Sequence, residues 1–125
     1  MGNYPGSLKY TKDHEWARAE GSRYVIGITD HAQAELGEVV FVDLPEVGKQ
    51  VTAGKPFGAA ESTKAASDLF APVTGKVVKA NEALKADPSA LNSDPYGAGW
   101  LVELEPTDGD TSHLMDADSY VKLLG

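Results

Sequence analysis

The chain has 125 residues and a formal net charge of −8, with 19 acidic against 11 basic side chains and no cysteine. An acidic surface repels nucleic acid and anionic membranes, so neither is expected as a partner. Without cysteine there are no disulfides, zinc–thiolate sites or cysteine nucleophiles, and any redox chemistry must use a borrowed group. This length is typical of one domain, and we expect residues 1–125 to form a single, monomeric one.

The N-terminal segment M-G-N-Y-P-G-S-L-K carries no targeting pattern. It lacks the apolar run of a secretory signal and the arginine-rich pattern of a transit peptide. No stretch reaches the roughly 18 apolar residues needed to span a bilayer. We therefore expect a soluble protein of the bacterial cytoplasm, with the mitochondrial matrix as the less favoured alternative.

The first third of the chain predicts a hairpin followed by a helix. Residues 15–20 and 23–28 favour two strands, and the Gly-Ser pair between them suits a hairpin turn. Thr29 or Asp30 can cap a short helix, and Gly37 can end it in a left-handed conformation.

The middle of the chain is predicted to be mainly strand. Residues 39–44 are nearly all apolar, as expected for a strand buried in the core of a sandwich. Further strands are expected at residues 57–61, 66–71, 76–80 and 100–105. In the last of these, Trp100, Val102 and Leu104 alternate with polar residues, which predicts that these three side chains share one buried face.

The remaining segments complete a mostly β pattern. Residues 85–99 are rich in turn-forming residues and predict a loop, whereas residues 116–124 predict a terminal helix. Segments 47–55 and 72–80 both place Gly-Lys beside valines, and this weak echo would make residues 61–68 the tip of a central hairpin. We expect an antiparallel β-sandwich with short peripheral helices.

No catalytic or metal-binding motif is found. Pro56 follows Lys55 where a P-loop needs Ser or Thr, and no G-x-S-x-G sequence is present. His14, His31 and His113 are far apart and belong to no H-E-x-x-H pattern, so no metal site is predicted. The sequence therefore indicates a protein that is not itself an enzyme.

The octapeptide E-S-T-K-A-A-S-D at residues 61–68 has one lysine, Lys64, among small side chains. A free lysine amine is neutral in roughly one molecule in a thousand at physiological pH, and Glu61 and Asp68 would favour its charged form. Lys64 is therefore better read as the substrate of a modifying enzyme than as a nucleophile. The plainer alternative is a solubilising surface charge.

Five segments together resemble the H-protein family of the glycine cleavage system. They are Y-T-K-D-H-E-W, G-I-T-D-H-A-Q-A-E-L-G-E-V-V-F-V-D-L-P-E-V-G, E-S-T-K-A-A-S-D-L-F-A-P-V-T-G-K-V, N-S-D-P-Y-G-A-G-W-L and L-M-D-A-D-S-Y. The resemblance covers nearly the whole chain in order. It implies a lipoyl-carrier domain over residues 1–125, with the barrel-sandwich hybrid fold of lipoyl and biotinyl carriers and no catalytic residue.

The resemblance also implies the site. Lys64 would carry lipoate in amide linkage, and Glu61, Thr63 and Ala65 would be recognised by the lipoylating enzyme, a lipoate ligase or a lipoyl or octanoyl transferase. Many family members have Val in place of Thr63, a nearly isosteric difference that we do not expect to affect modification.

The function implied is the transport of an aminomethyl group. Pyridoxal-phosphate glycine decarboxylase would load it, the tetrahydrofolate-dependent aminomethyltransferase would accept it, and FAD-containing dihydrolipoyl dehydrogenase would reoxidise the dihydrolipoate. By the same resemblance Glu15 would face the loaded ammonium in a cleft, with Asp68 and Asp13 in the same cleft. Otherwise Glu15 is only a solvated strand carboxylate.

Two other functions stay open at this point. The protein could act as a lipoyl relay that donates lipoate to 2-oxoacid dehydrogenase subunits, a role compatible with glycine cleavage. It could also be an unmodified β-sandwich interaction module, in which case Lys64→Arg would change nothing.

Overall fold

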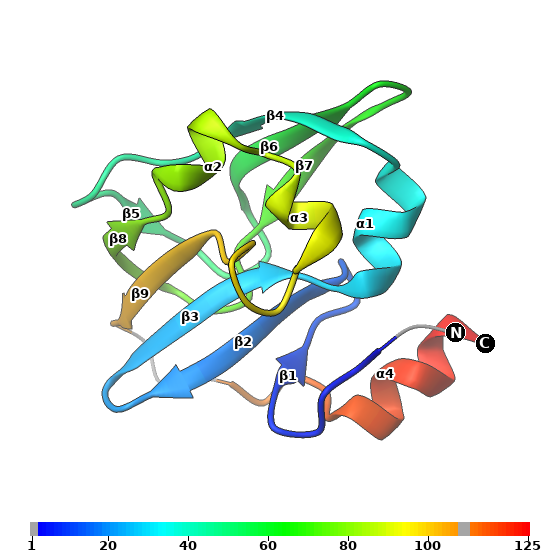
Figure 1. The fold of residues 1–125 in the computed structure, drawn as a ribbon. Coiled ribbons are helices and arrows are strands. Elements are labelled where there is room, and N and C mark those ends of the chain that lie inside the picture. The colour runs from blue at the N-terminus through cyan, green and yellow to red at the C-terminus, as the bar shows by residue number, and fades with distance from the viewer. Residues whose placement is uncertain (1–2, 108–110) are drawn as a thin grey trace.

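A computed structural model of the protein describes residues 3–107 and 111–125. It consists mostly of strands in two antiparallel sheets, with a few short helices at the periphery (Figure 1). The elements in chain order are β1 (Lys9–Tyr10), β2 (Glu15–Glu20), β3 (Arg23–Ile28), α1 (Asp30–Leu36), β4 (Val39–Asp43), β5 (Gln50–Val51), β6 (Pro56–Ser62), β7 (Ala66–Phe70), β8 (Gly75–Ala80), α2 (Ala83–Ala86), α3 (Ala90–Ser93), β9 (Val102–Pro106) and α4 (Ala117–Leu124).

The larger sheet has six strands in the order β1-β2-β3-β9-β8-β5, and the smaller has three in the order β4-β6-β7. The predicted mostly β, antiparallel fold with peripheral helices is confirmed, although the strands of residues 3–107 and 111–125 form no closed barrel. Within the described residues, no helix is long and apolar enough to cross a membrane.

Local signals at the start of the chain act as predicted. Strands β2 and β3 pair from Glu15↔Ile28 to Glu20↔Arg23, and the turn between them contains Gly21 at φ 62°. The hydroxyl of Thr29 caps α1 by accepting a hydrogen bond from the N–H of Ala32 at 3.2 Å. The helix gives way to Gly37 at φ 81°, a conformation that favours glycine.

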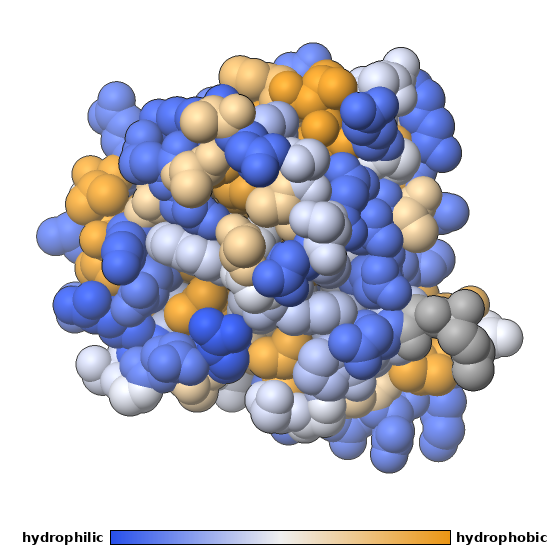
Figure 2. All heavy atoms as spheres, in the orientation of Figure 1, coloured by the Kyte–Doolittle hydropathy of each residue, from blue (hydrophilic) through white to orange (hydrophobic). Residues whose placement is uncertain are grey.

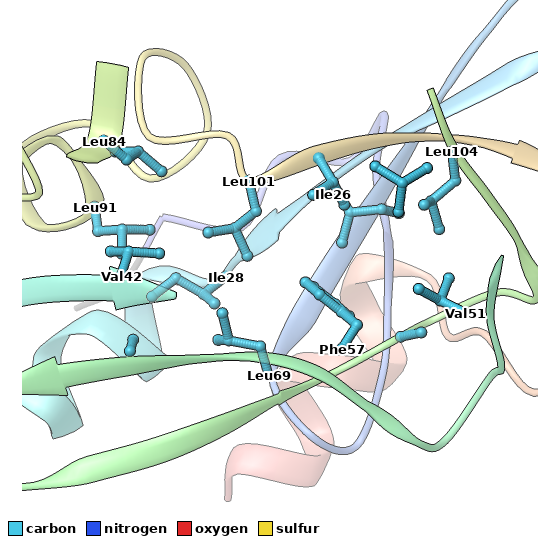
Figure 3. Close-up of a cluster of buried hydrophobic side chains, with 14 of the residues drawn as sticks. Ile26, Ile28, Val42, Val51, Phe57, Leu69, Leu84, Leu91, Leu101 and Leu104 are labelled. Atoms are coloured by element: carbon cyan, nitrogen blue, oxygen red, sulfur yellow. The ribbon is translucent and has the colours of Figure 1, made fainter. Parts of the chain in front are cut away.

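The core lies between the two sheets (Figure 3). Ile26 and Leu104 of the larger sheet face Phe57 and Leu69 of the smaller one, and all four side chains are buried. A second cluster of buried residues lies apart from this core and consists of Leu8, Tyr10, Trp16, Val25 and Tyr120. This second cluster attaches α4 to the strands that lead to the cleft described below.

The strand predicted at residues 39–44 is found as β4, but two of its apolar side chains do not enter the core as expected. Val40 and Phe41 are each 52% exposed, whereas Val39 and Val42 are buried. The cause is a register shift between Val39 and Phe41 in the pairing of β4 with β6, because a bulge places an extra residue on the outer side. Figure 2 shows an apolar patch at the top of the view, where Figure 1 places β4.

The segment before β9 also departs from the prediction. Trp100 precedes the strand and packs with the second cluster, so it does not share the buried face of Val102 and Leu104. Its N–H donates to the carbonyl of Gly97 at 3.1 Å, which keeps it in a turn, and Leu101 enters the core in its place. The predicted loop at residues 85–99 contains α3 and the end of α2.

The central hairpin is found where the sequence echo placed it. Strands β6 and β7 pair antiparallel, and β5 and β8 on either side of them in sequence pair with each other. The terminal helix α4 is also confirmed, with the side chain of Asp116 accepting a hydrogen bond from the N–H of Ser119 at 2.9 Å.

Candidate functional site

A tight turn presents Lys64 at the tip of the β6–β7 hairpin. The last strand pair is Glu61↔Ala66. Beyond it, the hydroxyl oxygen of Ser62 accepts hydrogen bonds from the N–H of Lys64 at 3.2 Å and of Ala65 at 3.0 Å. The N–H of Ser62 donates to the carbonyl of Ala65 at 2.7 Å. Because Lys64 is exposed on an ordered turn of small residues, an enzyme has open access to its amine.

The tip is held by the segment that joins α1 to β4. The N–H of Thr63 donates to the carbonyl of Glu38 at 3.0 Å. On either side of Glu38, the amide of Asn92 donates to the carbonyl of Gly37 at 2.7 Å and accepts from the N–H of Val39 at 2.9 Å. Asn92 in α3 therefore supports the segment against which the lysine turn rests.

A cleft of about 280 Å³ opens beside this hairpin. It brings together Asp13, Glu15, Ala65 and Asp68, four of the residues that the sequence singled out. The other lining residues are His14, Ile28, His31, Ala32, Glu35, Leu36, Ser67 and Leu69. Lys64, Glu61 and Thr63 do not line it, but Ala65 does, so the cleft begins one residue beyond Lys64.

Glu15 is the buried polar group of the cleft. Its side chain is only 2% exposed, so the alternative of a solvated strand carboxylate is wrong. The carboxylate accepts hydrogen bonds from the hydroxyl of Thr11 at 3.0 Å and from the N–H of Phe70 at 3.2 Å. Burial raises the pKa of Glu15 to about 8, although these two bonds act in the opposite direction.

The other predicted carboxylates are more accessible than Glu15. Asp68 is exposed on β7 opposite Ala59, and Asp13 is partly buried in the turn before β2. Glu61, Thr63 and Ala65 are all exposed around the lysine. Exposure at the tip is what recognition by a modifying enzyme requires, and that role stays a prediction.

Two histidines in the cleft were missed as a pair by the sequence analysis. His14 and His31 are far apart in the chain, yet their ring centroids lie 4.6 Å apart. Burial and the neighbouring His31 lower the pKa of His14. The only available signal was that His14 directly precedes Glu15. Among residues 3–107 and 111–125, no group of three or more potential ligands could hold a metal ion.

Known proteins resemble this chain over nearly its whole length. The family model described as "Glycine cleavage H-protein" matches residues 8–125. The chain belongs to the glycine cleavage H-protein family. Among curated relatives, the H protein of Myxococcus xanthus is 58% identical over 98% of this chain and 95% of its own length. That of Halalkalibacterium halodurans is 50% identical over 99% and 98% of the two chains.

A solved relative has the same fold. The crystal structure of a glycine cleavage system H protein from Mycobacterium marinum matches with a TM-score of 0.88 at 45% identity, covering 97% of this chain and 98% of that one. Membership of the family makes this chain a carrier component of the glycine cleavage system, where it works with the other components, rather than a catalytic enzyme. The family carries lipoate.

Proposed function

We propose that residues 1–125 act as a single lipoyl-carrier domain in which Lys64 bears lipoate in amide linkage. The turn fits this role because it offers one exposed amine, flanked by Thr63 and Ala65 and fixed through hydrogen bonds to Ser62. When bound, lipoate supplies a disulfide that can be opened, which this cysteine-free chain lacks. A lipoate ligase or a lipoyl or octanoyl transferase would read Glu61, Thr63 and Ala65 around the lysine.

The carrier's task is to take an aminomethyl group from pyridoxal-phosphate glycine decarboxylase to the tetrahydrofolate-dependent aminomethyltransferase, and then to present dihydrolipoate to FAD-containing dihydrolipoyl dehydrogenase. An exposed turn suits three successive partners, since the modified side chain can enter their active sites while the domain stays outside. Tethering also raises the effective concentration of the group at each docked enzyme. The bacterial cytoplasm stays the predicted compartment.

The buried carboxyl of Glu15 is the observation that carries this proposal. No cation forms an ion pair with it among the described residues, and its pKa of about 8 reflects the cost of an ionised carboxylate in that place. A small ammonium group entering the cleft would favour the ionised form and pair with it. The cleft therefore suits a cationic cargo, and it would shield that cargo from water.

The lipoyl relay would use the same exposed lysine but has no need of a buried carboxylate in a cleft. The two functions can thus be separated at Glu15. Lipoyl transfer by a pure relay would not depend on Glu15, whereas the lifetime of a bound cationic cargo would fall in Glu15→Ala.

The test is glycine-dependent exchange of carbon dioxide, measured with glycine decarboxylase and the lipoylated protein. Exchange should be lost with Lys64→Arg and retained with Lys55→Arg, since Lys55 is likewise an exposed lysine in a turn, next to Gly54. Full exchange with folded Lys64→Arg would contradict the proposal. Lipoyl transfer to a 2-oxoacid dehydrogenase subunit, measured on the same samples, would show whether the relay also operates.

A further inference from the structure

The hydroxyl of Tyr120, in the terminal helix α4, reaches the wall of the cleft. Tyr120 is fully buried, and its oxygen lies 2.7 Å from Nδ1 of His14 and 2.8 Å from the hydroxyl oxygen of Thr29. Its ring is stacked on that of Tyr10, with centroids 4.8 Å apart and planes 10° from parallel. The hydroxyl thus joins a cleft histidine to the residue that caps α1, the helix that carries His31.

Counting donors and acceptors shows where the protons lie in the hydrogen-bonded series of Thr29, Tyr120 and His14. Thr29 is fully buried, and its oxygen already accepts from the N–H of Ala32. If Thr29 donates to Tyr120 and Tyr120 donates to Nδ1 of His14, every hydroxyl proton has an acceptor. In the reverse order, Nδ1–H of His14 would donate to Tyr120 and Tyr120 would donate to Thr29. The hydroxyl proton of Thr29 would then have no acceptor among the described residues, and a buried unpaired donor is costly.

We infer that Tyr120 is a positioning residue of the cleft, which holds His14 as the neutral tautomer with its proton on Nε2. Tyr120 should hold this tautomer in the folded protein whether or not Lys64 is modified. Burial and the proximity of His31 lower the pKa of His14, and Asp13 and Glu35 offset this only in part, which agrees with a neutral ring.

The backbone of His14 is also held in place by hydrogen bonds. His14 has φ 70°, which is rare for a residue other than glycine, and its N–H donates to the carbonyl of Thr11 at 3.1 Å. Its carbonyl accepts from the N–H of Thr29 at 3.0 Å. The backbone is thereby fixed next to Glu15, and Tyr120 fixes the ring that extends from it.

The tautomer determines what the cleft offers to its occupant. With Nδ1 occupied by Tyr120, the remaining polar group of the His14 ring is the Nε2–H donor, and the ring lines the same cleft as the carboxyl of Glu15. A neutral donor does not repel a cation as an imidazolium would. This consequence rests on the proposed function, but the tautomer itself does not.

Nitrogen-15 NMR of the histidine rings in the unmodified protein tests the tautomer directly. We expect His14 of the wild type to show a protonated Nε2 and an unprotonated Nδ1. Tyr120→Phe, which keeps the ring stack and removes only the hydroxyl, should shift His14 toward a mixture of tautomers. A protonated Nδ1 in the wild type, or an identical His14 pattern in Tyr120→Phe, would overturn the inference.

Tyr10→Phe is the matched control. The hydroxyl of Tyr10 donates to the carbonyl of Pro5 at 2.7 Å, so this variant also removes a buried hydroxyl from the same stacked pair, with the loss of one hydrogen bond and none to His14. Its His14 signals should be those of the wild type. If both variants change His14 equally, Tyr120 acts only through general packing and the inference fails.

A second readout uses the lipoylated, cargo-loaded protein. The loaded form should lose ammonia several-fold faster in Tyr120→Phe than in Tyr10→Phe. Equal rates together with a shifted tautomer in Tyr120→Phe would refute the effect on the cargo. If the wild-type protein itself cannot be lipoylated, the proposed function fails while the NMR result still decides the role of Tyr120.

Discussion

The N–H of Phe70 in β7 donates a hydrogen bond to the buried carboxylate of Glu15 in β2, over 3.2 Å. Strand β2 belongs to the six-stranded sheet and β7 to the three-stranded sheet, so this bond crosses from one layer to the other. Strand β7 is also the strand that leaves the Lys64 turn. The hairpin that presents Lys64 is thus joined to the carboxylate of the cleft by a direct hydrogen bond.

Glu15 should make the stability of the unloaded protein depend on pH. Its pKa is about 8 in the folded protein against an ordinary value of 4.5, so the folded state holds this proton more tightly than the unfolded state. The free energy of unfolding should therefore fall as pH rises between these two values, by about 1.4 kcal/mol for each pKa unit at most. Denaturant unfolding at about pH 5 and about pH 8 measures this.

Glu15→Gln isolates that contribution because it keeps the shape of the side chain and removes the titration. We expect the variant to lose less stability than the wild type between the two pH values. Parallel curves for wild type and Glu15→Gln would mean that the carboxyl titrates alike in both states, against the burial seen here.

Glu15→Ala should leave lipoylation intact and shorten the lifetime of the cargo-loaded form. A hydrogen bond to a charged group contributes about 1.5 to 3 kcal/mol, so the loss of ammonia should accelerate about tenfold or more. The measurement is ammonia release from purified loaded protein with no other enzyme present. Glu20→Ala, at the exposed end of the same strand, should behave as the wild type. Equal release rates for Glu15→Ala and Glu20→Ala would refute the role of Glu15.

Asn92→Ala should slow the modification of Lys64. The amide of Asn92 supports the segment that receives the N–H of Thr63, and losing one or two net hydrogen bonds of about 1 kcal/mol each should reduce the lipoylation rate by about tenfold. Asn81→Ala is the control, because Asn81 donates to the carbonyls of Ala98 and Trp100, away from the hairpin. Wild-type rates of lipoylation in folded Asn92→Ala would show that the turn needs no such support.

Signals within a few residues of one another predicted much of the fold. The β2–β3 hairpin has the predicted bounds because Gly21 supplies a turn between two alternating segments, and α1 begins after Thr29 because that side chain caps it. The exposure of Val40 and Phe41 could not be predicted in this way. It arises from a bulge in the pairing with β6, a strand more than ten residues away.

Those two exposed residues provide a test of the bulge. Phe41→Ser should change the free energy of unfolding by no more than about 0.5 kcal/mol, as is usual at exposed positions. Val42→Ala removes two buried methyl groups and should cost about 2 kcal/mol. Denaturant unfolding of both variants compares them, and a larger loss for Phe41→Ser would place that side chain in the core.

The candidate site likewise has one part that neighbouring residues predict and another part that depends on distant segments. Lys64 was recognisable because its neighbours in sequence are small, and they also form the turn that exposes it. The burial of Glu15 depends on Phe70, and the position of His14 depends on His31 and Tyr120. Such contacts join segments far apart in the chain, and composition or spacing carries no signal for them.

Lipoylation of Lys64 is tested most directly by intact-mass and peptide-mapping mass spectrometry, after incubation of the protein with lipoate, ATP and a lipoate ligase. The result we predict is a single lipoyl increment on the peptide that contains Lys64, absent from Lys64→Arg and present in Lys55→Arg. No increment on the folded protein, while a control lipoyl domain is modified in parallel, would contradict the carrier function at its centre.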